Sequence, residues 1–219
     1  MSLADRIFMG ELQRWATSDV DAVKQFEAFV HGQKCAETPW APVTDYSEAA
    51  RNEAEGKHPA LILEHLIATS SADIFDYGCG PQAHLIRLLR AAARDTDIGV
   101  YGYDPQLWGS KVPTGSRLFD LVICREVLEH CTVLEARKVV SDLVRLSSRL
   151  VYVTTRFAQA PSHLLHVEDH DDLDPTHITM LTKPFLRTLF ILEGCTSRYD
   201  LEAKMDWKGL GRCLVMQVQ

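Results

Sequence analysis

The chain has 219 residues and a formal net charge of −7 at pH 7, from 23 Lys and Arg against 30 Asp and Glu. Hydrophobic residues make up 46% and charged residues 24%, which suffices for a buried core and excludes a largely disordered protein. The length corresponds to one domain of ordinary size, with or without a short extension. The acidic balance does not favour a broad basic surface for nucleic acid, and no apolar run reaches the ~20 residues of a membrane-spanning helix.

The six cysteines are scattered along the chain, and no two of them form a C-x-x-C pair. This spacing predicts reduced thiols of a cytoplasmic protein, neither a disulfide framework nor a zinc site. The N-terminus lacks the order of basic, apolar and small residues that marks a secretory signal. We therefore expect a cytoplasmic protein without a membrane partner.

The first 58 residues differ from the rest because they predict helices and no strand. Apolar residues recur at helical spacing from Leu3 to Trp15, and Ser18-Asp19-Val20-Asp21 resembles the capping box of a second helix. A segment of this size with two helices would struggle to bury a core of its own. We therefore expect a helical N-terminal cap over residues 1–58 and a larger domain over residues 59–219.

From residue 59 onward, helical and strand patterns alternate. Strands separated by helices predict right-handed β-α-β units and a mainly parallel sheet. The last two strands are expected to form a hairpin whose turn contains Gly209 and Gly211, which adds an antiparallel strand. The expected helices cover residues 59–67, 85–89, 134–146 and 182–192, and the expected strands cover residues 74–77, 100–103, 121–124, 150–153, 196–201 and 213–218.

The strongest motif is Asp76-Tyr77-Gly78-Cys79-Gly80-Pro81, between the first expected strand and the helix after it. Gly78 and Gly80 allow a tight turn and a close approach of the backbone to a ligand. A helix that begins near Pro81 directs free N–H groups toward the same place. Many turns between a strand and a helix contain glycine for purely conformational reasons, so the loop alone does not establish a binding site.

Two further features lie at the same edge of the expected sheet. The second strand ends in Gly102-Tyr103-Asp104, and a carboxylate at this position can accept hydrogen bonds from both hydroxyls of a ribose. The third strand begins at Phe119 and is followed by Arg125-Glu126-Val127-Leu128-Glu129-His130. Polar residues are thereby placed at the carboxyl ends of the strands, where open α/β sheets bind ligands.

With these three motifs in this order, residues 59–219 resemble a class I S-adenosylmethionine-dependent methyltransferase of the small type with a "DxGCG" loop and an "FDLV…VLEH" strand. The resemblance implies a Rossmann-like α/β fold, with a mainly parallel seven-stranded sheet and an antiparallel C-terminal strand. It also implies S-adenosyl-L-methionine as the cofactor. The residues expected to bind this cofactor are Asp76, Tyr77, Gly78, Cys79 and Gly80 in the loop, Asp104, Pro105 and Gln106 after the second strand, and Cys124, Arg125 and Glu126 after the third.

The sequence departs from the family pattern at two places. Gln82 replaces a glycine that is often found in the loop, and only 15 residues separate Asp104 from Asp120. One β-α unit is therefore expected to be abbreviated, so that the adenine pocket must be formed by other residues. The nearest candidates are Gln106, Leu107 and Trp108. Trp108 either stacks on the adenine or covers the sheet edge, and the sequence favours neither.

A nicotinamide-dependent dehydrogenase is the competing interpretation of the glycine loop. Such an enzyme would prefer G-x-G-x-x-G, and the third position of that pattern is Ala83 here, which is tolerable. Asp76 ahead of the glycines and the "VLEH" strand end favour the methyltransferase.

Catalysis of methyl transfer requires little from the protein beyond positioning the acceptor and, where needed, removing a proton. Glu129 and His130 are the obvious candidate bases. In the family, this Glu-His pair often has an architectural role instead. His177 matches a position where small methyltransferases commonly have histidine, and it is our first choice among the nine histidines.

A loop between residues 157 and 182 contains no Lys or Arg. It could close over a cationic acceptor, contribute a base or bind a divalent metal, or it could be only a solvated acidic loop. Five acids lie within residues 168–174, so the net charge of −7 belongs largely to this segment. The chemically active side chains of the loop are His163, His166, Glu168, Asp169, His170, Asp171, Asp172, Asp174 and His177.

The acceptor is expected to be a small or medium-sized molecule, methylated on oxygen or nitrogen. One alternative is a magnesium-dependent 2′-O-methyltransferase of RNA ends, because Glu126, Glu129 and His130 with a later histidine are similar to the magnesium site of such enzymes. The net acidity counts against this nucleic-acid partner. A second alternative, of another class, is a binding or structural protein that keeps the fold without turnover, which Gln82 and the short segment after Asp104 would explain.

Overall fold

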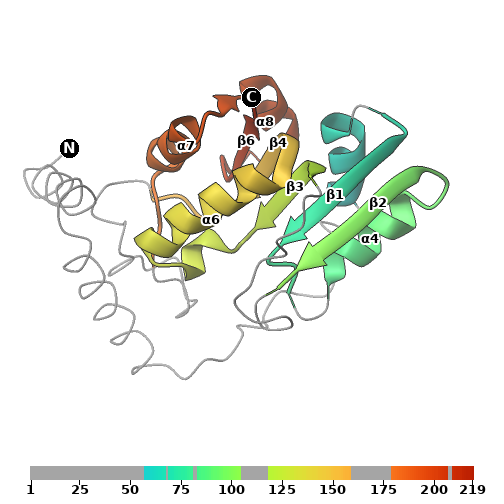
Figure 1. Cartoon of the computed structure of the whole chain (residues 1–219), viewed down its shortest axis with the longest axis horizontal. Coiled ribbons are helices and arrows are strands. Elements are labelled where there is room, and N and C mark those ends of the chain that lie inside the picture. The colour runs from blue at the N-terminus through green and yellow to red at the C-terminus, as the bar shows by residue number, and fades with distance from the viewer. Residues whose placement is uncertain (1–56, 68, 81–82, 105–117, 159–178, 207–208) are drawn as a thin grey trace, which may run out of the picture. The chain divides into compact units, whose positions relative to one another are not determined.

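The computed structural model (Figure 1) describes residues 57–67, 69–80, 83–104, 118–158, 179–206 and 209–219. The expected helices of the N-terminal cap lie outside these residues, so the boundary at residues 58 and 59 stays a prediction. The chain divides into two compact units, which are described separately. The first comprises Met1–Thr44, Val127–Val139 and Arg156–Leu186, and the second comprises Asp45–Glu126, Val140–Thr155 and Arg187–Gln219.

The second unit contains a six-stranded sheet with the order β2-β1-β3-β4-β6-β5. Its first four strands are parallel, and β6 is antiparallel to both of its neighbours. The strands are β1 (Ser71–Tyr77), β2 (Asp97–Tyr103), β3 (Phe119–Arg125), β4 (Ser147–Thr154), β5 (Thr196–Ser197) and β6 (Cys213–Gln217). This confirms the expected α/β class, the mainly parallel sheet and the antiparallel C-terminal strand. The described residues form six strands, whereas seven were expected. The abbreviated unit falls in residues 105–117, outside the described residues.

The helices follow the expected order. Residues 57–61 are helical and lead into the π-helical turn η1 (Ile62–Leu66). The other helical elements are α4 (His84–Ala92), the 3₁₀ turn η2 (Leu128–His130), α6 (Val133–Leu146), α7 (Lys183–Leu192) and α8 (Tyr199–Met205). Gly194 follows α7 with a φ of 88°, as expected for the glycine that ends a helix. Across the described part of the chain, none of these helices combines the length and apolarity needed to cross a bilayer.

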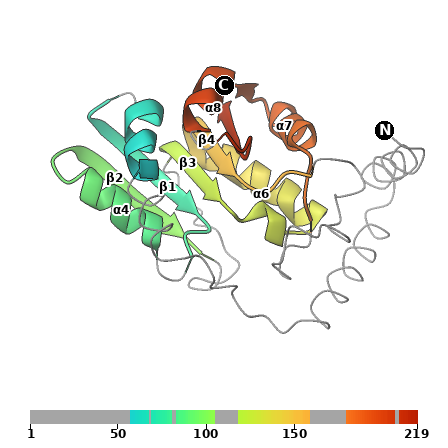
Figure 2. The same cartoon turned by 180° about the vertical axis from the view of Figure 1, so that it is seen from behind.

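One face of the sheet carries the main apolar core of the second unit. Val100, Ile74, Leu121 and Leu150 lie side by side across β2, β1, β3 and β4, and all four are buried. Residues of η1, α4 and α8 complete the same cluster, and Figures 1 and 2 show α4 and α8 beside the sheet. Because full burial of an aliphatic side chain is worth roughly 1.5–3 kcal/mol, this layer fixes the strands whose ends form the candidate site.

The opposite face of the same sheet is aromatic near β1 and β2. The rings of Phe75 and Phe119 stack with centroids 4.6 Å apart, and Tyr101 lies 5.7 Å from Phe119. Tyr77 contacts Tyr103 at 5.5 Å, at the carboxyl ends of both strands. Offset and edge contacts of this kind contribute beyond the area that they bury.

A hydrogen bond also crosses the main core. The Nε2 atom of His58 lies 2.7 Å from the phenolic oxygen of Tyr152, and both side chains are buried. Burial raises the pKa of Tyr152 well above its ordinary value, so the phenol stays neutral. The bond attaches the start of the first described helix to the central strand β4. Nothing in the sequence pattern signals it, because the two residues are 94 positions apart.

The expected hairpin at the end of the chain is wrong in one part. Of the strand expected at residues 196–201, only Thr196 and Ser197 pair with β6, and α8 begins at Tyr199. Leu201 and Met205 are one helical turn apart, and both join the main core together with Ile62 and Leu66. Burial of this helical pair favours α8 over a longer strand.

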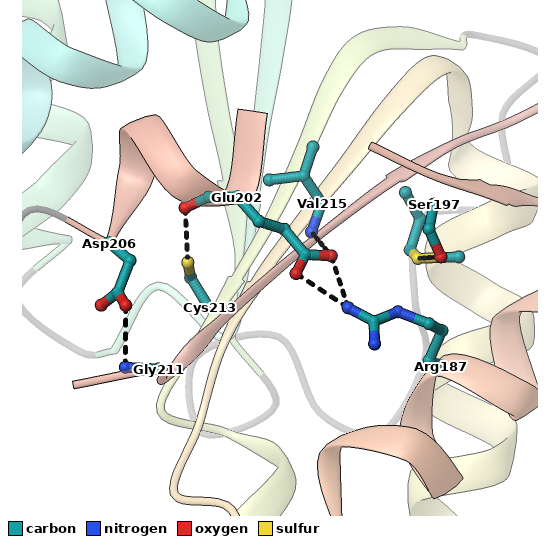
Figure 3. A network of polar contacts seen from close by, with 8 residues as sticks. Arg187, Ser197, Glu202, Asp206, Gly211, Cys213 and Val215 are labelled. Atoms are coloured by element: carbon teal, nitrogen blue, oxygen red, sulfur yellow. Dashed lines mark hydrogen bonds and ion pairs between the residues drawn. The ribbon is translucent and has the colours of Figure 1, made fainter. Parts of the chain in front are cut away.

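A polar network fixes α8 to α7 and β6 (Figure 3). One terminal nitrogen of Arg187, on α7, lies 2.9 and 2.8 Å from the two carboxylate oxygens of Glu202, on α8. The backbone N–H of Val215 donates to the same carboxylate at 3.4 Å. The carboxylate of Asp206 accepts from the backbone N–H groups of Leu210 and Gly211 at 3.0 and 2.9 Å.

In the first unit, two threonines begin the helices. Thr132 and Glu135 form a reciprocal capping box at the start of α6, with the backbone N–H of Thr132 donating to Oε2 of Glu135 at 2.8 Å and that of Glu135 donating to Oγ1 of Thr132 at 3.3 Å. Thr182 caps α7, since its hydroxyl oxygen accepts from the N–H of Phe185 at 3.3 Å. The start of α7 at residues 182–184 is therefore as predicted.

The ion pair of α7 and α8 predicts a specific stability effect. The side chains of Arg187 and Glu202 are only 16% and 7% exposed, so Arg187→Met should lower the free energy of unfolding by about 3–5 kcal/mol in urea denaturation, because it leaves a buried carboxylate without its cation. Adding Glu202→Met should recover part of this loss, since both charges are then removed.

The matched control is Arg145→Met. Its pair with Asp142 is 3.1 Å long but its own side chain is 46% exposed, so the loss should be only about 0–1 kcal/mol. Equal losses for the two arginine variants, or a double variant less stable than Arg187→Met alone, would contradict the role assigned to burial.

Candidate functional site

The glycine loop is attached to the end of β2 by three consecutive backbone N–H groups. Those of Gly78 and Cys79 both donate to the carbonyl of Tyr103, at 2.7 and 3.0 Å. That of Gly80 donates to Oδ2 of Asp104 at 2.8 Å. Gly78 and Gly80 have φ angles of 78° and 67°, which residues other than glycine rarely adopt. The tight turn inferred from the sequence is therefore present, and Asp104 lies beside it as expected.

The loop packs closely on β2 because Gly102 has no side chain. A Cβ atom placed there would collide with Cδ1 of Ile86, on α4, and would lie 3.1 Å from Sγ of Cys79. The glycine thus lets the loop and the helix after it approach the strand together. A glycine inside a strand is a recognised sign of such close approach. The packing role of Gly102 could therefore have been predicted from the sequence, although Gly102 was not among the expected site residues.

Asp76, the first residue of the motif, lies at the carboxyl end of β1 and is only 2% exposed. Its neighbours across the sheet are Gly102 on β2 and Ile123 on β3. Burial raises the pKa of Asp76 from 3.8 to about 7, while Arg125 lowers this pKa and Asp104 raises it. A carboxyl group with such a pKa changes its charge near neutral pH.

The thiol of Cys79, in the same loop, is unsuited to act as a nucleophile. Burial and the nearby carboxylates of Asp76 and Asp104 raise its pKa to about 11. With this pKa the thiol stays protonated at neutral pH. The thiolate, which is the reactive form, is therefore scarce. Cys79 therefore serves the packing of the loop.

The end of β3 supplies the third group of expected site residues. Cys124 is fully buried beside Tyr77, and Arg125 is half-buried and pairs with Thr154 of β4. Glu126 is exposed and has a φ of 49°, a left-handed conformation that costs a non-glycine residue roughly 1–2 kcal/mol. Its N–H donates to the carbonyl of Thr154 at 2.8 Å, which holds this turn in place.

Within the second unit, the structure therefore gathers the described cofactor candidates at one edge of the sheet. The ends of β1, β2 and β3 contribute the loop at 76–80, Asp104, and the segment 124–126, respectively. Pro105 and Gln106 lie outside the described residues, as does Trp108. Whether the gathered residues bind the cofactor stays a prediction.

The candidate bases Glu129 and His130 belong to the first unit. Glu129 is fully buried in η2, whereas His130 is exposed. The carbonyl of Glu129 accepts from the N–H of Thr179 at 3.2 Å. An exposed imidazole is accessible to a substrate and a fully buried carboxyl is less so, but the catalytic role of both residues stays a prediction.

His177 and the rest of the acidic loop at residues 159–178 lie outside the described residues. The part of the chain that the structure describes holds no group of three or more His, Cys, Asp or Glu side chains arranged for a metal ion. The magnesium-site hypothesis of Glu126, Glu129 and His130 includes a later histidine, so it stays a prediction.

Comparison with known proteins supports the fold. No protein-family model matches the chain, and no curated protein sequence matches it. A solved structure of a putative sarcosine dimethylglycine methyltransferase from Galdieria sulphuraria is similar, with a TM-score of 0.50 and 13% identity over 77% of this chain and 85% of that chain. Magnesium protoporphyrin IX methyltransferase from Synechocystis PCC 6803 gives a TM-score of 0.47 and 12% identity over 94% and 97% of the two chains. The [4+2]-cyclase SpnF gives a TM-score of 0.49 and 11% identity over 90% of this chain and 94% of that chain.

The strand order and the similarity to the Galdieria sulphuraria structure define the class of fold. The chain has the Rossmann-like fold of the class I S-adenosylmethionine-dependent methyltransferases, as its motifs predicted. At these identities the likeness concerns the fold alone, and a fold of this kind hosts many different activities.

The close approach at Gly102 predicts a coupled mutational effect. Gly102→Ala should lower the free energy of unfolding by about 1–3 kcal/mol through overpacking. Ile86→Val, which removes the colliding Cδ1 atom, should cost about 0.5–1.5 kcal/mol alone. The double variant should lose less than the sum of the two, measured by urea denaturation. Strictly additive losses would show that Ile86 does not limit the space beside Gly102.

Asp76 predicts a pH-dependent stability. Its pKa of about 7 in the folded chain exceeds the ordinary 3.8, so folding retains a proton that the unfolded chain releases between about pH 4 and pH 7. Its contribution to stability is therefore present below pH 4 and is lost as the pH rises to 7. Asp76→Asn should accordingly raise the free energy of unfolding by a few kcal/mol at pH 8 and change it little at pH 4.

The control is Asp73→Asn, which removes a carboxyl group from the other end of the same strand. It should lack the pH-dependent gain of Asp76→Asn. An Asp76→Asn variant that is destabilised at both pH values would mean that the ionised carboxylate of Asp76 makes favourable contacts, for example with Arg125, that outweigh the cost of its burial.

Proposed function

We propose that the chain is an S-adenosylmethionine-dependent methyltransferase that transfers a methyl group to the oxygen or nitrogen of a small or medium-sized acceptor. The observation that carries the proposal is the attachment of the glycine loop to β2. It brings the carboxylate of Asp104 to 2.8 Å from the backbone nitrogen of Gly80, so that the half-buried turn and the acid proposed to bind the ribose belong to one rigid assembly.

The residues at this edge fit the cofactor in two respects. A Cβ atom added at Gly80 would meet no other atom within 4 Å, so there is open space beside the loop backbone. The described acids there, Asp76, Asp104 and Glu126, outnumber the cationic side chain of Arg125. An acidic environment suits a ligand whose sulfonium and ammonium groups outnumber its single carboxylate.

When bound, the cofactor supplies a methyl group that its sulfonium activates for in-line displacement. The protein then needs to hold the cofactor and orient the acceptor. Asp104 would accept hydrogen bonds from the ribose hydroxyls with the carboxylate that also fastens Gly80. Glu126 would present its exposed carboxylate beside the loop.

Proton removal from the acceptor is assigned to His130 or His177, with Glu129 as the further candidate. An imidazole with an ordinary pKa near 6.5 is suited to accept this proton at neutral pH. The identity of the acceptor is not specified by the fold.

Replacement of Asp104 tests the cofactor site. Asp104→Asn keeps an oxygen that can accept from the N–H of Gly80 but removes the charge, so affinity for S-adenosylhomocysteine in calorimetry should fall about tenfold, from the loss of charge-assisted hydrogen bonds worth roughly 1.5–3 kcal/mol. Asp104→Ala should reduce it further, because the loop loses its anchor too.

Two results would separate the alternatives. If the wild-type chain binds neither S-adenosylmethionine nor S-adenosylhomocysteine, the proposed function is wrong. If it binds both but transfers no methyl group to any acceptor tested, the non-catalytic protein of the same fold is favoured instead. Unchanged affinity in Asp104→Asn would mean that the ribose is held elsewhere.

A further inference from the structure

The turn between α8 and β6 is held in shape by one acid, Asp206. Its Oδ1 atom accepts from the backbone N–H of Leu210 at 3.0 Å, and its Oδ2 atom accepts from that of Gly211 at 2.9 Å (Figure 3). Its backbone carbonyl accepts from the N–H of Gly209 at 2.9 Å. Gly209 and Gly211 have positive φ angles of 65° and 64°, which suit glycine. The described residues of this turn, Asp206 and 209–212, are therefore fixed by their own hydrogen bonds.

This turn lies at the same edge of the sheet as the candidate cofactor site. Cys213, the first residue of β6, pairs with Thr154, the last residue of β4, and the N–H of Thr155 donates to the carbonyl of Arg212 at 3.2 Å. The N–H of Glu126, after β3, donates to the carbonyl of the same Thr154. Because β1, β3 and β4 are parallel, their carboxyl ends share one edge. Backbone hydrogen bonds therefore connect the turn to the end of β3 through β4.

The turn presents one apolar and one cationic side chain to solvent. Leu210 is 54% exposed, and Arg212 is exposed as well. Among the described residues, no acid forms an ion pair with Arg212, and the carboxylate of Asp206 is engaged by the backbone of the turn. A guanidinium beside an aliphatic side chain offers the two contacts that suit a ligand with an anionic group and an apolar body.

The balance of charge changes along this edge. At the ends of β1, β2 and β3, the acids Asp76, Asp104 and Glu126 outnumber Arg125, whereas the start of β6 presents the cation Arg212. In the sheet, β6 is separated from β3 by β4 alone, and neighbouring strands are about 4.8 Å apart, so the turn lies roughly 10 Å from the end of β3. An anionic group is repelled by the acidic end of the edge and attracted to the other end.

We propose that Leu210 and Arg212 bind the methyl acceptor and select one that carries a carboxylate or a phosphate on an apolar body. Arg212 pairs with the anionic group and Leu210 packs against the apolar part. The anionic group is thereby held away from the acids near the glycine loop, so the opposite end of the acceptor receives the methyl group. This inference rests on the proposed function and specifies the acceptor class, which is of medium size because it spans this distance.

The experiment is calorimetric titration of the full chain, saturated with S-adenosylhomocysteine, with 4-hydroxycinnamate. This probe has a phenolic oxygen and a carboxylate at opposite ends of a rigid apolar body. The matched neutral probe is 4-hydroxycinnamyl alcohol, which differs by the loss of the carboxylate. A third probe, 2-(4-hydroxyphenyl)ethyl phosphate, distinguishes a preference for phosphate from one for carboxylate.

The expected result is tighter binding of at least one anion than of the alcohol. Arg212→Gln should weaken binding of that anion about five- to tenfold and leave binding of the alcohol unchanged, because only the anion pairs with the guanidinium. Leu210→Ala should weaken binding of both by a similar factor, about threefold, because it removes a shared apolar contact.

The matched control is Arg94→Gln. Arg94 is an 80% exposed cation in the turn between α4 and β2, at the opposite edge of the sheet, so its loss should leave all three affinities unchanged. Urea denaturation of each variant checks that the fold is retained.

Four results would overturn the proposal: no binding of either anion at millimolar concentration, binding of the alcohol as tight as that of the anions, unchanged affinity for the anion in Arg212→Gln, or an equal loss in Arg94→Gln. Each of them leaves the proposed function standing, because S-adenosylhomocysteine is already bound in these titrations. Failure of S-adenosylhomocysteine itself to bind would instead contradict the proposed function.

Discussion

The attachment of the glycine loop to the end of β2 is the interaction on which the candidate site depends. Three consecutive N–H groups of the loop are directed to two acceptors, the carbonyl of Tyr103 and the carboxylate of Asp104. The attachment is close because Gly102 leaves room for Ile86 and Cys79. The loop and the acid after β2 therefore form one body, and any movement of β2 against β1 would displace both together.

Local patterns in the sequence were sufficient to predict the parallel strands, most helices and the place of the motif. Buried strands and amphipathic helices have hydrophobic patterns that can be recognised within a few residues. They failed where the deciding contact is distant. Residues 199–205 become α8 because Leu201 and Met205 reach the core around Ile62, and no local pattern contains that contact. The hydrogen bond between His58 and Tyr152 could not be predicted either, because it joins residues that are distant in the sequence. The site itself was predicted as a set of segments, but the bond from Gly80 to Asp104 and the burial of Asp76 required the fold.

Features that cost stability gather at the carboxyl edge of the second unit's sheet. Ala83 and Glu126 are the non-glycine residues with left-handed backbone among those the structure describes, and both follow the strands whose ends form the site. The buried carboxyl of Asp76 lies at the same edge. Strain and unfavourable burial persist where the surrounding structure is rigid enough to impose them, and they are concentrated at functional sites in many proteins. Their grouping here agrees with the position of the proposed cofactor site.

The two outer strands of the described sheet bear on how the protein behaves at high concentration. β5 contributes only two residues, and the carbonyl of Val100 on β2 is occupied by the guanidinium of Arg90, at 3.2 and 2.7 Å from Nε and a terminal nitrogen. Long unpaired strand edges are templates on which a second chain can add its own strand. The two-residue strand β5 offers few such groups, which disfavours edge-to-edge association on that side of the described sheet. On the other side, Arg90 occupies one carbonyl of the seven-residue strand β2.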